Sequence, residues 1–125
     1  DVAQNPSELT RLGAAFNHPL IAFPANLGGG TGAAPSASFA RVESPGVVLT
    51  SLKRGEDGGI VLRLVELDGQ ATDAVVALAP GIAPAGAAVS TVDLLERPEA
   101  GSARLENGRL VVAVPAHGIV GVRIG

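Results

Sequence analysis

The fold is decided by residues 47–66, which read VVLTSLKRGEDGGIVLRLVE. Two apolar runs flank a short break of charged residues and glycine. In the second run Ile60, Leu62 and Leu64 alternate with a more mixed set of side chains, as in a strand that turns one face to a core. Residues 57–59 (Asp-Gly-Gly) tolerate the positive φ angles that hairpin turns require. The stretch therefore predicts a β-hairpin whose charged tip lies in solvent.

From residue 36 onward, short apolar runs alternate with turn signals in the same way. Among the turn signals, Asn107-Gly108 is the strongest indication of a hairpin. The starts of the candidate strands lie roughly 8–15 residues apart, which is typical of a sandwich or barrel. The candidate strands are 37–42, 46–53, 59–66, 72–79, 87–95, 102–106, 109–115 and 118–124. We therefore predict an all-β fold, an antiparallel β-sandwich of about seven or eight short strands over residues 20–125.

Residues 1–19 look least like a strand and are predicted to be a linker into the domain or a short helical turn. Leu9, Leu12 and Phe16 recur at helical spacing. Ser7 is suited to cap a turn or two of helix. Of the two interpretations, the sequence favours the linker.

Residues 20–35 join this segment to the regular strands. Their apolar start, residues 20–23 (LIAF), is a candidate first strand. The glycine-rich remainder, from Asn26 to Pro35, is typical of a loop. Within it, Gly28–Gly32 lacks the Gly-Lys-Ser/Thr ending of a phosphate-binding loop, so we assign no nucleotide site.

The composition indicates one domain with an aliphatic core. The chain has 125 residues, of which 46% are hydrophobic, with three Phe and no Trp, Tyr, Met or Cys. A chain of this size buries roughly two-thirds of its unfolded surface. The abundance of Val and Ile favours strands over long helices. The first residue is Asp1 rather than Met, so we expect a processed product or a piece of a longer protein.

Charge and cysteine content exclude several classes of function. The net charge of −3 arises from 9 basic and 12 acidic side chains, which is not the basic surface that nucleic acid requires. No apolar run reaches the roughly 18 residues of a membrane span. The lack of cysteine excludes disulfides and thiolate metal sites and is compatible with a reducing compartment such as the cytoplasm. Neither nucleic acid nor a membrane is therefore expected as a partner.

The residues that often carry chemistry form no recognisable site in this sequence. The two histidines, His18 and His117, are almost a hundred residues apart and share no carboxylate at ligand spacing, so no metal site is expected. His117 is expected in a surface turn. Glu56 and Asp57 fall at the hairpin tip, where they would be solvated rather than tuned for acid–base catalysis. Asp93, if buried, needs a hydrogen-bond partner, which indicates a structural role.

A nucleophile or a sugar-binding platform is not indicated either. The chain has no Cys, and no Ser lies in a Gly-x-Ser-x-Gly motif. Sugar platforms usually rely on exposed Trp or Tyr, and this chain has neither. This counts against an independent carbohydrate-binding module.

Four stretches resemble one known family, the terminal β-sandwich domain of glycoside hydrolase family 38, the α-mannosidases. Residues 47–66 resemble a family string that reads approximately VVLTALKRAEDG…LILRLYE. Residues 16–22 (FNHPLIA) are similar to the family's lead-in segment, 92–96 (VDLLE) to a following strand, and 112–124 (VAVPAHGIVGVRI) to the closing hairpin. The resemblance covers essentially the whole chain.

The resemblance implies that this chain is not itself catalytic. Family members are retaining α-mannosidases that use a zinc ion held by His and Asp, with an Asp nucleophile, all in a large N-terminal catalytic domain. No motif of that domain is present, so no catalytic, cofactor-binding or metal-ligating residue is assigned, and zinc is expected only in the absent catalytic domain. The sequence departs from the family pattern at three places, all outside the catalytic residues. Gly55 stands where the family usually has Ala, and residues 28–32 are unusually rich in glycine. His117 and Gly118 stand where the family often has a larger apolar residue and Glu.

The implied function is that of a C-terminal accessory β-sandwich that packs against the other domains of an α-mannosidase-like enzyme and stabilises its catalytic unit. The alternative is a free-standing sandwich that binds carbohydrate or protein. The N-terminal segment would lead back toward the rest of such an enzyme, so we expect a docking surface there, or self-association of an isolated domain. The competing interpretation is that these side chains complete the domain's own core. The candidate docking residues are Leu9, Leu12, Phe16, Leu20, Ile21 and Phe23.

Overall fold

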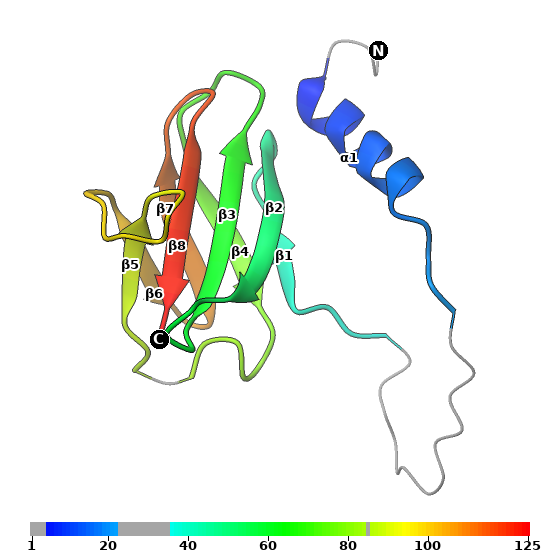
Figure 1. The fold of residues 1–125 in the computed structure, drawn as a ribbon. Helices are drawn as coiled ribbons and strands as arrows, with labels where there is room; N and C mark the ends of the chain where they lie inside the picture. Colours follow the sequence, from blue (N-terminus) through cyan, green and yellow to red (C-terminus); the bar gives the residue numbers. More distant parts are fainter. Residues whose placement is uncertain (1–4, 23–35, 85) are drawn as a thin grey trace, which may run out of the picture.

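Alternating aliphatic residues build eight strands in a computed structural model that describes residues 5–22, 36–84 and 86–125. One helix, α1 (Pro6–Asn17), precedes the strands. The strands are β1 (Ala40–Val42), β2 (Val47–Arg54), β3 (Ile60–Glu66), β4 (Thr72–Leu78), β5 (Val89–Val92), β6 (Ala103–Glu106), β7 (Arg109–Val114) and β8 (Ile119–Ile124). Each of the candidate strands from residue 37 onward is present, and the all-β sandwich is confirmed (Figure 1).

Two four-stranded antiparallel sheets pack face to face (Figure 1). Sheet A has the order β1-β4-β7-β6, and sheet B has the order β2-β3-β8-β5. The core between them is aliphatic, because its buried hydrophobic side chains are all Val, Leu, Ile or Ala. Leu62 and Leu64 are fully buried, and Ile60 is half-buried against the same core. The predicted core face of the hairpin is therefore confirmed.

Both predicted hairpin turns are confirmed. In the β2–β3 turn, Gly58 has a φ of 93°, and the amide of Gly55 donates to the carbonyl of Gly59 at 2.7 Å. In the β6–β7 turn, Asn107 and Gly108 have φ angles of 50° and 77°. Two consecutive residues in this left-handed region are what a tight two-residue hairpin loop requires.

The strand predicted at 87–95 is shorter in the structure, because β5 ends at Val92. The Asp93 carboxylate accepts the backbone amides of Leu95 and Arg97 at 2.8 and 2.9 Å. These bonds hold the chain in a turn, since they occupy amides that a continuing strand would pair with a neighbour. Asp93 thus has the structural hydrogen-bonding role that was predicted, but at a turn rather than within a strand.

Of the two interpretations of the N-terminal segment, the helical one is confirmed, and the helix is longer than a turn or two. α1 has 12 residues. Its N-cap is Asn5, whose side chain accepts the amide of Glu8 at 3.1 Å. Pro6 follows at the start of the helix, where its missing N–H is not needed. Ser7, the predicted cap, is instead buried beside Asp68.

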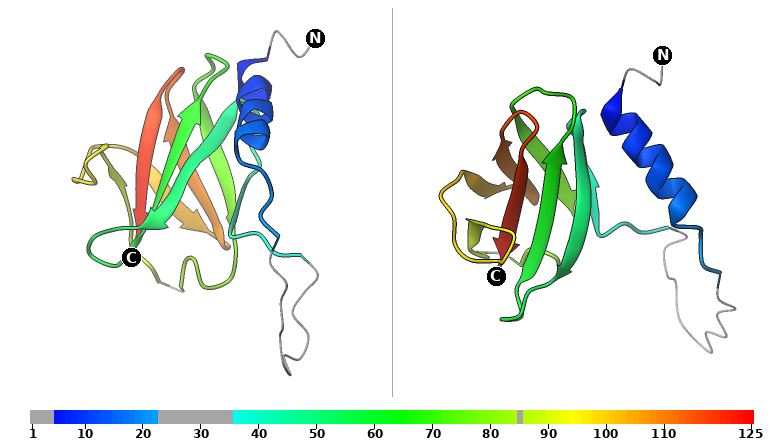
Figure 2. Two further views of the ribbon diagram at one scale, coloured as in Figure 1. Left: turned by 45° about the vertical axis from the view of Figure 1, so that its right-hand side comes forward. Right: turned by 45° about the horizontal axis from the view of Figure 1, so that its top comes forward.

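The helix stands beside β2, the edge strand of sheet B, and outside the sandwich (Figures 1 and 2). Residues 20–22 form no strand. Phe23, the last residue of that candidate strand, and the predicted loop at 26–35 lie outside the described residues. The division into a lead-in segment, 1–19, and a domain, 20–125, stays a prediction.

Candidate functional site

The candidate docking segment is attached to the sandwich at two points. Ser7 is buried, and its amide donates to Asp68 Oδ1 at 3.2 Å. One turn later, the Arg11 guanidinium donates to the carbonyl of Val47 at 2.9 Å. The Asp68 carboxylate therefore faces the N-terminal end of α1, where the helix dipole favours a negative charge. Both contacts are polar, and both lie in the first half of the helix.

The apolar residues of this segment lie in solvent. Leu9, Leu12 and Phe16 share one face of α1 because they are three and four residues apart, and we call them the α1 stripe. The exposed fractions are 47% for Leu9, 54% for Leu12, 88% for Phe16, 102% for Leu20 and 77% for Ile21. Phe23 lies outside the described residues. The five described side chains belong to no part of the core between the sheets.

A second group of exposed apolar side chains lies on the sandwich, at positions that the sequence placed in strands and not in a docking surface. Leu94 and Leu95 are 62% and 72% exposed in the turn after β5. Ile119, the first residue of β8, is 53% exposed. A usable signal was present in the sequence, because the two adjacent leucines come just before Arg97-Pro98, a dipeptide typical of turns.

The charged tip of the β2–β3 hairpin belongs to an ion-pair network. Glu56 and Asp57 are exposed, as predicted. Asp57 pairs with Arg123 of β8, and Lys53 of β2 pairs with Glu96. The hydrogen bond from the Lys53 ammonium lowers the pKa of Glu96, against the opposing effect of burial. The network links β2, β8 and the turn after β5, so these charged side chains have a structural role.

Glu66 is a buried acidic side chain whose partners are backbone amides. Its Oε1 accepts the amide of Asp68 at 2.7 Å, and its Oε2 accepts the amides of Gly69 and His117 at 2.9 and 2.8 Å. Burial raises the pKa of Glu66, but the amides of His117, Asp68 and Gly69 lower it by more, so the net shift is downward. The carboxylate thereby joins the β3–β4 loop to the β7–β8 turn, which is a structural role.

The two histidines lie apart, at opposite ends of the chain. His18 follows the last residue of α1 and forms its C-cap. His117 is exposed in the β7–β8 turn, as predicted, with a φ of 54°. Within residues 5–22, 36–84 and 86–125, no three His, Cys, Asp or Glu side chains gather closely enough to hold a metal ion. In the same three ranges, we find no helix with the length and apolar character needed to cross a membrane.

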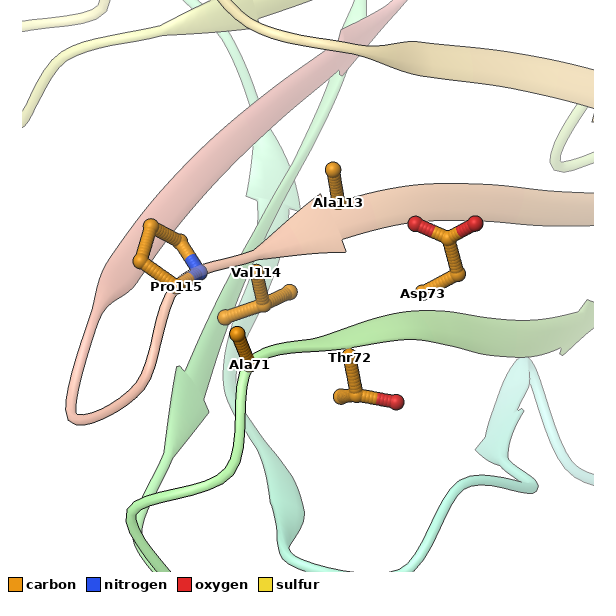
Figure 3. A pocket seen from close by; sticks show the side chains of 6 residues that line it. All are labelled: Ala71, Thr72, Asp73, Ala113, Val114 and Pro115. Atoms are coloured by element: carbon orange, nitrogen blue, oxygen red, sulfur yellow. The ribbon is translucent and has the colours of Figure 1, made fainter.

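A shallow cavity of about 370 Å³ lies where β4 begins and β7 ends (Figure 3). Asp73 and Ala113 point to one side of sheet A, whereas Thr72 points to the other, so the polar side chains do not converge (Figure 3). The lining residues are Ala71, Thr72, Asp73, Ala113, Val114 and Pro115. With a single acidic group among them, this lining does not supply the acid and base pair that glycoside hydrolysis uses.

Comparison with known proteins identifies the sandwich. The family model for the glycosyl hydrolases family 38 C-terminal beta sandwich domain matches residues 46–119, which is more than half of the chain. The match begins just before β2 and ends on the first residue of β8, so it contains Glu66 and the turn after β5 but not α1 or β1. Neither the curated proteins nor the solved structures that were compared with the chain gave a match.

Proposed function

The chain belongs to the family of glycosyl hydrolase family 38 C-terminal beta sandwich domains, and on this premise we propose that it is a non-catalytic accessory domain of an α-mannosidase-like glycosidase. In this role it packs against the other domains of the enzyme and stabilises the catalytic unit. The zinc ion that the family uses is assigned to the catalytic domain and not to this chain.

The observation that carries this proposal is the α1 stripe. Most helices in proteins owe their stability to the packing of an apolar face, because a short helix is marginal alone in water. α1 is attached to the sandwich through Ser7 and Arg11, while the stripe itself stays exposed. An adjoining domain that covers the stripe would supply the packing that the sandwich does not.

The test uses the complete glycosidase polypeptide that carries this chain. Leu12→Asp with Phe16→Asp places two charges in the stripe. Thr10→Asp with Asn17→Asp adds the same two charges at exposed positions of α1 that lie outside both the stripe and the face attached through Ser7 and Arg11. We expect heating to inactivate the stripe variant at a temperature about 2 °C or more below that of the unmodified enzyme, the shift that a loss of about 1 kcal/mol causes in a larger domain. The α-mannosidase activity that remains after heating measures it.

The control variant should be inactivated at the temperature of the unmodified enzyme. The activity of both variants before heating should be unchanged, because no residue of α1 is assigned to the active site. If the two variants were inactivated at the same temperature, docking through the stripe would be wrong, and a role in binding carbohydrate or protein would be favoured.

A further inference from the structure

The turn after β5 presents two leucines to solvent and is closed by its own polar groups. Leu94 and Leu95 are largely exposed. The Asp93 carboxylate accepts the backbone amides of Leu95 and Arg97 and also the Arg97 guanidinium, at 2.8 to 2.9 Å. The amide of Glu96 donates to the carbonyl of Asp93 at 3.0 Å. The conformation of the turn is therefore set before any partner arrives.

Side chains of sheet B form hydrogen bonds and an ion pair with the same turn. Arg63 of β3 donates to the carbonyl of Leu94 at 3.3 Å, and Arg123 of β8 donates to the carbonyl of Glu96 at 3.2 Å. Lys53 of β2 pairs with the Glu96 carboxylate. Three strands of the sheet thus contact the turn, which lies over the outer face of sheet B (yellow in Figure 1).

The backbone of the turn is strained at one residue, and this strain indicates a functional role for the turn. Glu96 has a φ of 63°, a left-handed conformation that is uncommon for residues other than Gly, Asn and Asp. Strained residues persist where the surrounding contacts determine them, and they concentrate at functional sites. A loop that is ordered in advance binds a partner at a lower entropic cost than a loop that must be ordered on binding.

The two outer faces of the sandwich differ in character. On sheet B, Val48, Val65 and Ile119 lie opposite one another in β2, β3 and β8 and form an apolar row. Sheet A instead carries ion pairs, of Glu43 with Arg41 and Arg109 and of Arg104 with Glu106. Within the described residues, the strands of sheet A hold no exposed large apolar side chain, and Phe39, which directly precedes β1, is 71% exposed.

We propose that Leu94, Leu95 and Ile119 form a second docking surface, the leucine knob, which inserts into an apolar pocket on another domain of the same glycosidase polypeptide. This inference rests on the proposed function and adds a surface that the α1 stripe does not include. α1 stands beside β2 at one edge of sheet B, and the knob lies over β8 and β5 toward the other edge. One surface therefore lies beside the edge of sheet B, and the other lies over its outer face.

The size of the leucine knob favours a tethered partner over a second copy of the chain. The exposed fractions of its three side chains add up to roughly two fully exposed residues. A stable interface between free chains covers about 800 Å² on each partner, far more than this. A domain on the same polypeptide needs less surface, because the tether gives a high effective concentration. Since the knob carries no charge, the pocket that receives it must be apolar and free of unpaired charges.

The test measures thiol labelling at single introduced cysteines, since the chain contains none of its own. Leu95→Cys reports on the leucine knob, Phe16→Cys on the α1 stripe, and Ala113→Cys on the exposed outer face of sheet A. Each is placed in the 125-residue chain and in the complete polypeptide, and a maleimide is followed by mass spectrometry of the peptide that carries the site. Leu94→Cys gives a second reading at the knob.

We expect the maleimide to react with Leu95→Cys at least about tenfold more slowly in the complete polypeptide than in the 125-residue chain. This ratio corresponds to a docked state that is populated at least about tenfold more than the undocked state. Ala113→Cys should label at the same rate in both. If Leu95→Cys labelled equally fast in both while Phe16→Cys was protected, the knob would be wrong and the proposed function would stand. If neither was protected, both proposals would fail. Protection of Leu95→Cys in the 125-residue chain that grew with protein concentration would identify a second copy as the occupant and overturn the inference.

Discussion

Glu66 shows how one residue at the end of a strand closes one end of the sandwich. It follows Leu62 and Leu64 at intervals of two, so strand alternation turns its side chain inward. There it accepts three backbone amides, from the β3–β4 loop and the β7–β8 turn. One of these amides belongs to Asp68, whose carboxylate attaches α1. The attachment of the helix thus depends on a loop that Glu66 positions.

Glu66 should make the free energy of unfolding depend on pH below 4.5, the ordinary pKa of its carboxyl group. Because the pKa of Glu66 is lowered in the folded state, the carboxylate stabilises the fold above pH 4.5, and this contribution is lost as the pH falls through the folded value. Glu66→Gln would place an amide NH₂ group against backbone N–H donors. We expect this variant to be less stable than the wild type at neutral pH, as measured by urea unfolding.

The difference in unfolding free energy between the wild type and Glu66→Gln should narrow as the pH falls below 4.5. The pKa values of Glu43, Asp93 and Glu96 are also lowered, but both proteins share these groups, so their effects cancel in the difference. Glu56→Gln, at the exposed hairpin tip, is the matched control and should follow the wild-type curve. A difference that stayed constant with pH would contradict this role of Glu66.

At the scale of elements, alternation predicted the strands, whereas hydrogen bonds of polar side chains decided where some elements begin and end. The hairpin strands predicted at 46–53 and 59–66 agree with β2 and β3 to within one residue. β5 ends early because the Asp93 carboxylate takes the next backbone amides. Ser7 is not the cap of α1, because it bonds instead to Asp68, which is 61 residues away. A contact over this separation cannot be predicted from the pattern of neighbouring residues.

The candidate docking surfaces were predictable to different degrees. The spacing of Leu9, Leu12 and Phe16 placed them on one helical face, but their exposure follows from how α1 is attached to the sandwich. The exposure of Leu94 and Leu95 depends on a turn that Asp93, Arg63 and Arg123 hold together from three parts of the chain. Strand alternation alone would have turned one of the two leucines inward.

The β6–β7 hairpin depends on the left-handed conformation of Gly108, whose φ is 77°. A Cβ added at Gly108 would meet no atom within 4 Å, so Gly108→Ala isolates the backbone conformation from steric contact. We expect a loss of about 1–2 kcal/mol in the free energy of unfolding, the usual cost of this conformation for a residue with a Cβ. Urea unfolding measures it.

Gly13→Ala is the matched control, since Gly13 also has open space around its Cβ position but lies within α1. Alanine is the better helix former by up to about 1 kcal/mol. This variant should therefore increase the helical signal in circular dichroism and leave the unfolding of the sandwich nearly unchanged. A Gly108→Ala variant as stable as the wild type would show that the turn does not require this conformation.

In the molecule as a whole, the residues that stabilise the fold are different from the apolar residues that are exposed to partners. The core lies between the two sheets and includes no residue of α1. The outer face of sheet A carries ion pairs, and sheet B is flanked by the α1 stripe and the leucine knob. A domain arranged in this way packs around its own core, and its exposed apolar side chains gather at α1 and in the turn after β5 beside sheet B.

This separation predicts that the sandwich folds without its N-terminal segment. A chain of residues 20–125 loses the hydrogen bonds of Ser7 and Arg11, each worth about 0.5–1.5 kcal/mol, and loses no core side chain. Leu64→Ala in the full chain removes part of a fully buried side chain and should cost about 2–5 kcal/mol. The truncated chain should therefore unfold in one cooperative transition, as followed by urea titration, and should be more stable than the Leu64→Ala variant. If the truncated chain failed to fold while Leu64→Ala still folded, α1 would be part of the domain itself, and the predicted boundary after residue 19 would be wrong.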